Sequence, residues 1–216
     1  MAKVTELIIL HTTKYGENSL VVHTLSKDYG RRSFLVRGAG KSRMSLFLPL
    51  NVLEGQVGES SKSSLYSLTG ISTKYPLNGI RGSIYKNSMT MFMSEVLYRV
   101  LKEEVSDAEI FEWCEKKILL LDAIETSFSN FHLYFLLDLS VVLGFSPSSS
   151  DIKLFMGEHY PTVEKLMSLS FAESMLLPMT GQERNEIAGR ILKYIESHTD
   201  TPIVVNSLRV LRECFY

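Results

Sequence analysis

Cysteines, secretion signals and long apolar runs are scarce or missing in this 216-residue sequence, and each shortage narrows what the protein can be. Its two cysteines, Cys114 and Cys214, are too few for a disulfide-stabilised secreted domain. The longest apolar run, residues 131–143, is broken by His132 and Asp138 and is too short to cross a bilayer. No basic-then-apolar secretion signal begins the chain, so we expect a cytoplasmic protein.

The sequence motifs of the common enzyme classes are also missing. It has no Gly-x-Ser-x-Gly nucleophile elbow and no His-Glu-x-x-His zinc pair. The segment Gly38-Ala-Gly-Lys-Ser42 ends like a phosphate-binding loop, but Leu35 stands where that loop has its first glycine. Cys114 and His132 lie on apolar helical stretches, so we expect both side chains in the core. We predict a protein that is not an enzyme; a hydrolase assembled from residues distant in sequence is an alternative.

The formal net charge of −1 hides an uneven distribution along the chain. Residues 1–80 carry ten Lys or Arg against five Asp or Glu, whereas residues 81–216 carry thirteen against nineteen. A basic first part favours a polyanionic partner, because positive charge attracts phosphate backbones. The acidic remainder would repel such a backbone, which favours a protein partner there instead.

The first part of the chain predicts a small closed barrel. Short runs rich in β-forming residues alternate with turns that contain glycine or asparagine, and no long helix interrupts them. Five short strands in about 70 residues are typical of an OB-like barrel, although an SH3-like barrel fits the pattern almost as well. The expected strands are residues 4–11, 19–26, 31–37, 50–57 and 64–71.

Beyond Pro76, apolar residues recur at helical spacing, which predicts a second, α-helical domain. The expected fold is therefore α+β, with a barrel domain over residues 1–78 packed on a helical domain over residues 79–216. Three pairs fit the pattern of a helix-starting capping box: Ser106/Glu109, Ser170/Glu173 and Thr180/Glu183. Residues 146–160 are expected to form a loop with a short hairpin. The expected helices are residues 83–102, 107–124, 129–144, 171–177, 181–197 and 204–214.

An ordered set of short segments runs through both parts of the chain. They are Tyr15-Gly-Glu17, Leu20-Val-Val22, Gly30-Arg31 and Arg37-Gly-Ala39 in the barrel, followed by residues 131–145 and 206–211 in the helical part. This order resembles the RecO family of recombination mediators. The resemblance implies an OB-fold that holds DNA. It also implies a non-catalytic role in DNA repair and recombination: annealing single strands and helping to load recombinase onto DNA coated by single-stranded DNA-binding protein.

Basic and aromatic residues of the barrel are the candidate DNA contacts. Strand alternation places Arg31 and Arg37 on one face, where they could flank a groove. The glycine loop 38–40 is followed by Lys41 and Arg43. A glycine loop with two cations can contact phosphates without recognising the base sequence. Tyrosines at the turns could stack on unpaired bases. If these residues are ordinary surface groups instead, the protein is an adaptor whose barrel binds a peptide. The candidates are Lys14, Tyr15, Lys27, Arg31, Arg32, Arg37, Lys41 and Arg43.

The helical part is the candidate site for protein partners. The resemblance implies two of them, RecR and the acidic, hydrophobic C-terminal tail of single-stranded DNA-binding protein. An apolar groove edged by cations would suit that tail. The candidate edge residues are Arg99, Lys102, Lys116 and Lys117.

A metal site is not expected. Many RecO-like chains carry a four-cysteine zinc site just after a Leu-Gly-Phe element. Here Leu143-Gly-Phe145 is followed by residues 146–151, which contain no cysteine. Since no Cys-x-x-Cys spacing occurs anywhere in the chain, we predict no structural zinc, and packing must hold this region instead.

Overall fold

The computed structural model describes residues 3–58, 65–103, 105–199 and 201–214, with the backbone alone at residues 41, 42 and 149. The chain divides into two compact units. The first joins residues 1–78 to residues 94–119, and the second joins residues 79–93 to residues 120–216. The chain passes between the units at three points: between residues 78 and 79, and within two long helices, at residues 93/94 and 119/120. Because the two units interleave along the chain, a single domain boundary between residues 78 and 79 stays a prediction.

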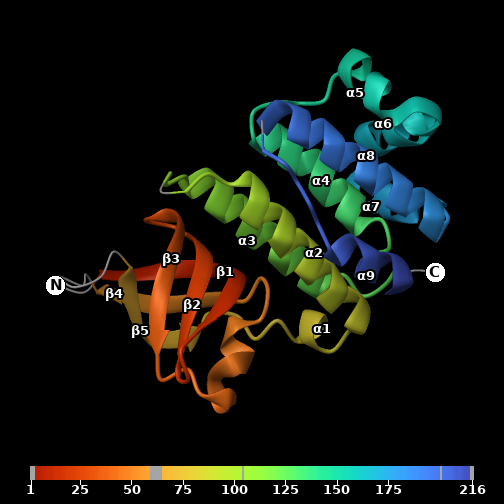
Figure 1. Ribbon diagram of the computed structural model, residues 1–216. Coiled ribbons are helices and arrows are strands. Elements are labelled where there is room, and N and C mark those ends of the chain that lie inside the picture. The colour runs from red at the N-terminus through yellow and green to blue at the C-terminus, as the bar shows by residue number, and fades with distance from the viewer. Residues whose placement is uncertain (1–2, 59–64, 104, 200, 215–216) are drawn as a thin grey trace. The chain divides into compact units, whose positions relative to one another are not determined.

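The first unit contains a closed five-stranded barrel, as the sequence predicted (Figure 1). The strands follow one another around the barrel in the order β1, β2, β3, β5, β4. All neighbours are antiparallel except β3 and β5, which pair in parallel through Phe34 with Tyr66 and Leu35 with Ser67. This architecture is consistent with an OB-fold. The strands are β1 (Lys3–Tyr15), β2 (Ser19–Ser26), β3 (Gly30–Arg37), β4 (Val52–Gly58) and β5 (Tyr66–Thr73).

The barrel core is formed by side chains that point inward from alternate positions of the strands. In β3, Phe34 and Val36 are buried while Arg37 is exposed, because successive side chains point to opposite faces. Leu35, on the same face as Arg37, is also buried, so part of the outward face of this strand is covered. The inward residues of the other strands join Phe34 and Val36 in one apolar cluster: Leu7, Ile9, Leu20, Val22, Leu53, Val57 and Leu68.

Residues 41–47 form a short 3-10 helix, η1 (Lys41–Phe47), directly after the glycine loop. Phe47 is 4 % exposed and joins the barrel core, which fastens the end of this helix. The Asn51 amide donates to the main-chain oxygens of Ser45 and Leu46, both at 2.9 Å. The sequence predicted no helix here, and β4 begins at Val52 rather than at the expected residue 50.

The second half of α2 (Ile84–Val100) and most of α3 (Ala108–Ala123) belong to the same unit as the barrel. The segment between these helices pairs with the start of β3, through a parallel bridge between Arg31 and Glu103. Gly30 permits this close approach: a Cβ atom there would stand 2.0 Å from the main-chain oxygen of Val105. The backbone of Gly30 also has a positive φ of 65°, which favours glycine.

The second unit is helical, as predicted. Its long apolar helix α4 lies alongside α8 (Figure 1), and the two bury Phe131, Phe135, Ile187 and Ile191. Among the described residues, no helix combines the length and apolarity needed to cross a membrane. The elements outside α2 and α3 are α1 (Asn78–Arg81), α4 (Phe131–Val142), α5 (Ser149–Met156), η2 (Gly157–His159), α6 (Tyr160–Ser168), α7 (Phe171–Leu176), α8 (Gly181–Thr199) and α9 (Ser207–Cys214).

The expected loop and hairpin over residues 146–160 are wrong. The chain there forms α5 and η2, and α6 follows. The Ser148 side chain accepts a hydrogen bond from the amide of Asp151, so the serine-rich start is a helix cap rather than a loop. Ile152 and Met156 recur at a spacing of four and are fully buried, which supplies the apolar face that stabilises α5.

The predicted caps are correct at two helices and wrong at a third. Ser170 and Glu173 form a complete capping box at α7, and Thr180 accepts from the amide of Glu183 at α8. At α3, however, Asp107 accepts from the amides of residues 109 and 110. Ser106 instead donates to the main-chain oxygen of Lys27. The cap of α3 is therefore Asp107 rather than Ser106.

Two titratable side chains predicted to be in the core are buried. Cys114 is 1 % exposed, and burial raises the pKa of its thiol, so the group is an unreactive apolar side chain. His132 is 2 % exposed, and burial, followed by the positive charge of Arg184, lowers its pKa to about 3. Both groups are therefore neutral at physiological pH.

Candidate nucleic-acid interface

The turn between β1 and β2 and the end of β3 bring two of the candidate DNA contacts together. Tyr15 pairs with Ser19, and Ser19 pairs with Arg37 on the next strand. Directly paired residues point to the same face of a sheet, so the side chains of Tyr15 and Arg37 share one face. Two strand spacings separate them, about 10 Å. Tyr15 is 58 % exposed and Arg37 is also exposed.

The glycine loop continues this surface. The amide of Ala39 donates to the main-chain oxygen of Asn18 at 3.2 Å, which fastens the loop to the turn between β1 and β2. Gly38 has a positive φ of 67° and has open space where a Cβ atom would stand. An open backbone of this kind lets another molecule approach closely.

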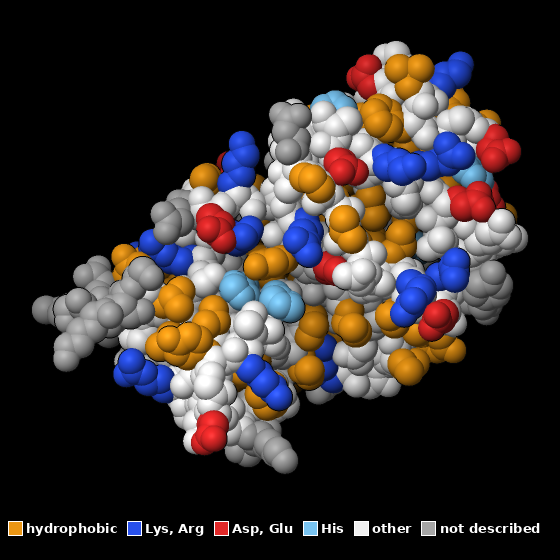
Figure 2. All heavy atoms as spheres, viewed as in Figure 1, with side chains coloured by type: hydrophobic (Ala, Val, Ile, Leu, Met, Phe, Trp, Pro, Cys, Tyr) orange, Lys and Arg blue, Asp and Glu red, His pale blue; other side chains and the backbone are white. Residues whose placement is uncertain are grey.

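We call this surface the hairpin end and define it by Lys14, Tyr15, Arg37, Lys41 and Arg43. Lys14 is exposed and Arg43 is half-buried, whereas the side chain of Lys41 lies outside the described part of the chain. No carboxylate occurs among residues 36–47, so positive charge dominates the loop and η1. Figure 2 shows Lys and Arg side chains exposed around this part of the barrel. The hairpin end is thus suited to contact phosphates.

The other basic candidates lie at the opposite end of β2 and β3. Arg31 is six residues from Arg37 on the same strand, about 20 Å away. Lys27 lies between two carboxylates, with its Nζ 3.6 Å from Glu6 and 3.9 Å from Glu112. The structure therefore divides the eight predicted DNA contacts into two groups rather than bringing them into one site.

Arg31 closes the end of α2. Its Nη1 donates to the main-chain oxygens of Tyr98 at 3.1 Å and Leu101 at 3.2 Å, and its Nη2 donates to Glu103 at 2.7 Å. The last carbonyls of a helix have no partner within the helix, so these bonds satisfy groups that would otherwise be buried unpaired. With its side chain only 15 % exposed, Arg31 has a structural role.

Arg32 and Lys27, the other two residues of this second group, also make contacts within the protein. The guanidinium of Arg32 lies 4.3 Å from the centre of the Tyr66 ring. Glu6, which lies beside Lys27, accepts from Lys74 at 2.7 Å, and Lys74 in turn reaches Glu115 on α3 at 2.7 Å. The hydrogen bond from Lys74 is the main reason that the pKa of Glu6 is lowered. These charges connect α3 to the barrel.

The candidate partner residues belong to the first unit: Arg99 lies on α2, Lys116 and Lys117 lie on α3, and Lys102 lies in the segment between the two helices. Arg99, Lys102 and Lys116 are exposed, whereas Lys117 is only 8 % exposed and lies 5.8 Å from the ring of Trp113. The second unit has an apolar groove of its own, with a volume of about 200 Å³. Its lining includes Tyr134, Leu137, Asp138, Val141, Leu166 and Met167.

A cluster of rings on the outward face of the barrel did not figure in the sequence predictions. The rings of His11, His23 and Tyr98 lie within 5.6 Å of one another, measured between ring centres. Burial is the main cause of the lowered pKa of His23, followed by the charges of His11 and Arg31. The three rings come from β1, β2 and α2, so no local pattern in the sequence indicates this cluster.

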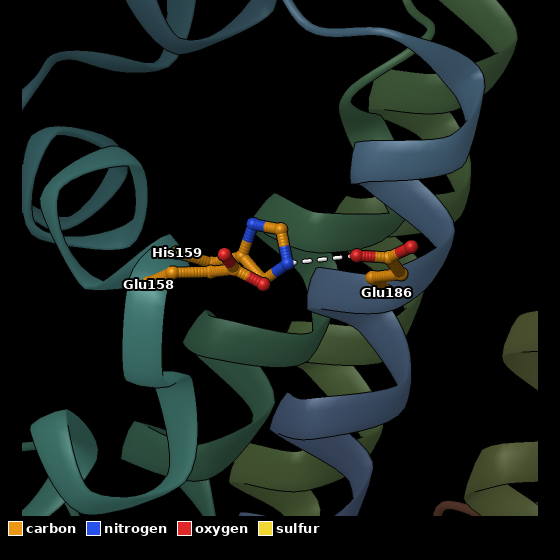
Figure 3. A group of neighbouring side chains, drawn as sticks. All are labelled: Glu158, His159 and Glu186. Carbon is orange, nitrogen blue, oxygen red and sulfur yellow. Dashed lines mark hydrogen bonds and ion pairs between the residues drawn. The ribbon is translucent and has the colours of Figure 1, made fainter.

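One group of side chains has the composition of a metal site. Glu158 and His159 come from η2 and face Glu186 on α8 (Figure 3). His159 Nε2 lies 2.9 Å from Glu186, and Gln182 donates to the other oxygen of that carboxylate. The hydrogen bonds from Gln182 and His159 lower the pKa of Glu186. The histidine–carboxylate hydrogen bond links η2 to α8, and the absence of structural zinc stays a prediction.

The chain has the architecture of a closed OB-type barrel followed by a helical region. Comparisons with known proteins show which family it belongs to. The model for the N-terminal part of recombination protein O matches residues 1–76, and the model for its C-terminal part matches residues 81–151. DNA repair protein RecO of Phocaeicola vulgatus is 32 % identical over the full length of both chains. The RecO proteins of Flavobacterium johnsoniae and Azobacteroides pseudotrichonymphae are 29 % and 28 % identical over 98 % of each chain.

The chain belongs to the RecO family of DNA repair proteins. The matches to both family models and the full-length relatives confirm the resemblance that the ordered segments indicated. They support a role in DNA repair and recombination.

Proposed function

We propose that the protein is a recombination mediator that binds and anneals single-stranded DNA. In this role it helps to load recombinase onto DNA coated by single-stranded DNA-binding protein. The observation that supports this most strongly is the hairpin end, where Lys14, Arg37, Arg43 and an exposed tyrosine lie near an open glycine loop that Lys41 follows in the sequence. Family membership supports the wider role in DNA repair.

Charge neutralisation is the proposed mechanism. Two single strands repel each other through their phosphates, and cations of the hairpin end reduce that repulsion while the bases find partners. No covalent bond forms or breaks in this process, so the proposed role is not enzymatic. Since phosphate contacts carry no sequence information, binding should depend little on base sequence.

The helices are the proposed site for protein partners, which we take to be RecR and the acidic tail of single-stranded DNA-binding protein. Arg99, Lys102 and Lys116 supply exposed positive charge that suits an acidic peptide. The second unit offers a separate candidate surface, the groove beside Tyr134 and Leu166, whose apolar lining suits a hydrophobic residue of a partner. We further propose a cytoplasmic location, where the DNA and both partners are present.

A strand-annealing measurement tests the proposal. Two complementary oligonucleotides carrying a fluorophore and a quencher are mixed with the protein, and the rate of quenching is followed. We expect the double variant Lys41→Ala/Arg43→Ala to anneal at least about tenfold more slowly, because it removes two of the four cations. The matched control is Lys165→Ala/Lys193→Ala, which removes two exposed cations of the second unit.

Equal annealing rates for the two double variants would contradict the proposed site. If the unaltered protein neither binds nor anneals the strands, the DNA-binding proposal fails, and the adaptor whose barrel binds a peptide becomes the better account. Binding to a labelled peptide with an acidic, hydrophobic C-terminus would then be the next measurement.

A further inference from the structure

A line of rings begins at the hairpin end and runs along β1 to α2; its rings on β1 are exposed and its ring on α2 is half-buried. We call it the aromatic strip and define it by Tyr15, His11 and Tyr98. Tyr15 and His11 occupy alternating positions of β1 and so face the same side. The ring of Tyr98, from the half of α2 that belongs to the barrel unit, lies 5.4 Å from the ring of His11.

The His11 ring is exposed but firmly supported from beneath. It is stacked on His23, with the ring centres 5.6 Å apart and the planes 25° apart. His23 is held in turn by hydrogen bonds between its two ring nitrogens and the hydroxyls of Ser33 at 2.7 Å and Thr13 at 3.2 Å. A ring fixed in this way loses little conformational entropy when another planar group stacks on it.

The charges around the strip suit an anionic ligand. The guanidinium of Arg99 lies 5.9 Å from the centre of the Tyr98 ring, and Arg37 lies at the other end of the strip. Arg31 also lies beside the Tyr98 ring, at 4.7 Å, but its charge is paired with that of Glu103 at 2.7 Å, so this pair adds no net charge. A ligand with flat rings and negative charge matches this combination of groups.

We propose that the aromatic strip binds the bases of single-stranded DNA, with His11 as a stacking residue. This inference rests on the proposed function, in which the hairpin end holds the phosphates. Four residue steps separate His11 from Tyr15, about 13 Å. That distance is several times the 3.4 Å spacing of stacked bases, so the two rings contact different bases of an extended strand. Stacking of this kind tolerates any base.

Binding to two oligonucleotides of equal length distinguishes the contribution of base stacking from that of phosphate contacts. One is a fluorescently labelled thymidine oligomer, and the other is an abasic strand with the same phosphates. We expect His11→Ala to lower affinity for the thymidine oligomer about tenfold, measured by fluorescence anisotropy, because one stacked base is lost. Affinity for the abasic strand should not change. His11→Phe, which keeps a flat ring, should bind the thymidine oligomer within about twofold of the unaltered protein.

The matched control is His198→Ala, which removes an exposed histidine of the second unit and should affect neither oligonucleotide. If His11→Ala binds the thymidine oligomer as tightly as the unaltered protein, or loses affinity equally for both strands, the stacking proposal is overturned while the proposed function stands. If the unaltered protein binds neither strand, both proposals fail.

Discussion

The guanidinium of Arg31 donates to the main-chain oxygen of Leu101 at 3.2 Å, so a strand of the barrel caps the end of a helix 70 residues away in sequence. The same group also donates to Tyr98 and pairs with Glu103. Arg31, which the sequence suggested as a DNA contact, thus has a structural role in the barrel unit, and its contact with DNA stays a prediction.

Replacing Arg31 should therefore affect stability. We expect Arg31→Ala to lower the free energy of unfolding by about 2 kcal/mol, because it leaves helix-end carbonyls without their charged donor. Urea denaturation followed by circular dichroism measures this change. Affinity for single-stranded DNA, measured well below the unfolding midpoint, should stay within about twofold of the unaltered protein. A stable variant with much weaker DNA binding would show that Arg31 contacts DNA.

Arg37, on the same face of β3, should behave in the opposite way. Its exposed side chain contributes little to stability, so Arg37→Ala should unfold within about 0.5 kcal/mol of the unaltered protein. If Arg37 neutralises one phosphate, the plot of log affinity against log salt should become shallower by about 0.7. The measurement is fluorescence anisotropy at several salt concentrations, and an unchanged slope would remove Arg37 from the site.

Gly30 should tolerate no side chain. A Cβ atom there would overlap the main-chain oxygen of Val105, so we expect Gly30→Ala to destabilise the protein by at least about 2 kcal/mol. Gly38→Ala is the matched control, since Gly38 also has a positive φ but has open space around it. Gly38→Ala should lower the free energy of unfolding by about 1 kcal/mol, because it strains the backbone without causing a clash. Equal melting temperatures for the two variants would contradict this account of Gly30.

The buried His132 should make stability depend on pH. Its pKa is about 3 in the folded protein, and that of an unfolded histidine is about 6.5, so acid protonates the unfolded chain first. The stabilising effect of the neutral ring is fully present above about pH 6.5 and is lost as the pH falls towards 3. We expect a loss of about 1.4 kcal/mol per pH unit between pH 6 and pH 4.

Urea midpoints measured at several pH values test this dependence. His132→Leu should be less dependent on pH over the same interval, even if it is less stable overall. The remaining dependence would come from carboxylates such as Glu6 and Asp28, whose lowered pKa values make stability fall below about pH 4. If His132→Leu and the unaltered protein lose stability in parallel, the histidine is not responsible.

The barrel and most helices could be predicted from the sequence because they depend on local patterns. Alternation of apolar residues specified β2 and β3 nearly to the residue, and Ser170 with Glu173 marked the start of α7. The segment 146–160 could not be predicted in this way. Its serines and proline looked like loop residues, and the burial that stabilises α5 depends on packing against α8.

The candidate site was harder to predict for a similar reason. Arg31 and Arg37 look alike in the sequence, since both follow the alternation of one strand. Only tertiary contacts distinguish them: Arg31 caps α2, whereas Arg37 is exposed at the hairpin end. The pairing of His11 with Tyr98 spans 87 residues and has no local signal at all.

The salt dependence of single-stranded DNA binding tests the central claim most directly. Anisotropy of a labelled oligonucleotide is measured from low to physiological salt. The comparison is between the unaltered protein and the variant Lys14→Ala/Arg37→Ala/Lys41→Ala/Arg43→Ala. We predict a log–log slope of roughly −3 for the unaltered protein, from four phosphate contacts, and little binding by the variant. Binding that does not respond to salt, or a variant that binds as tightly as the unaltered protein, would contradict the account.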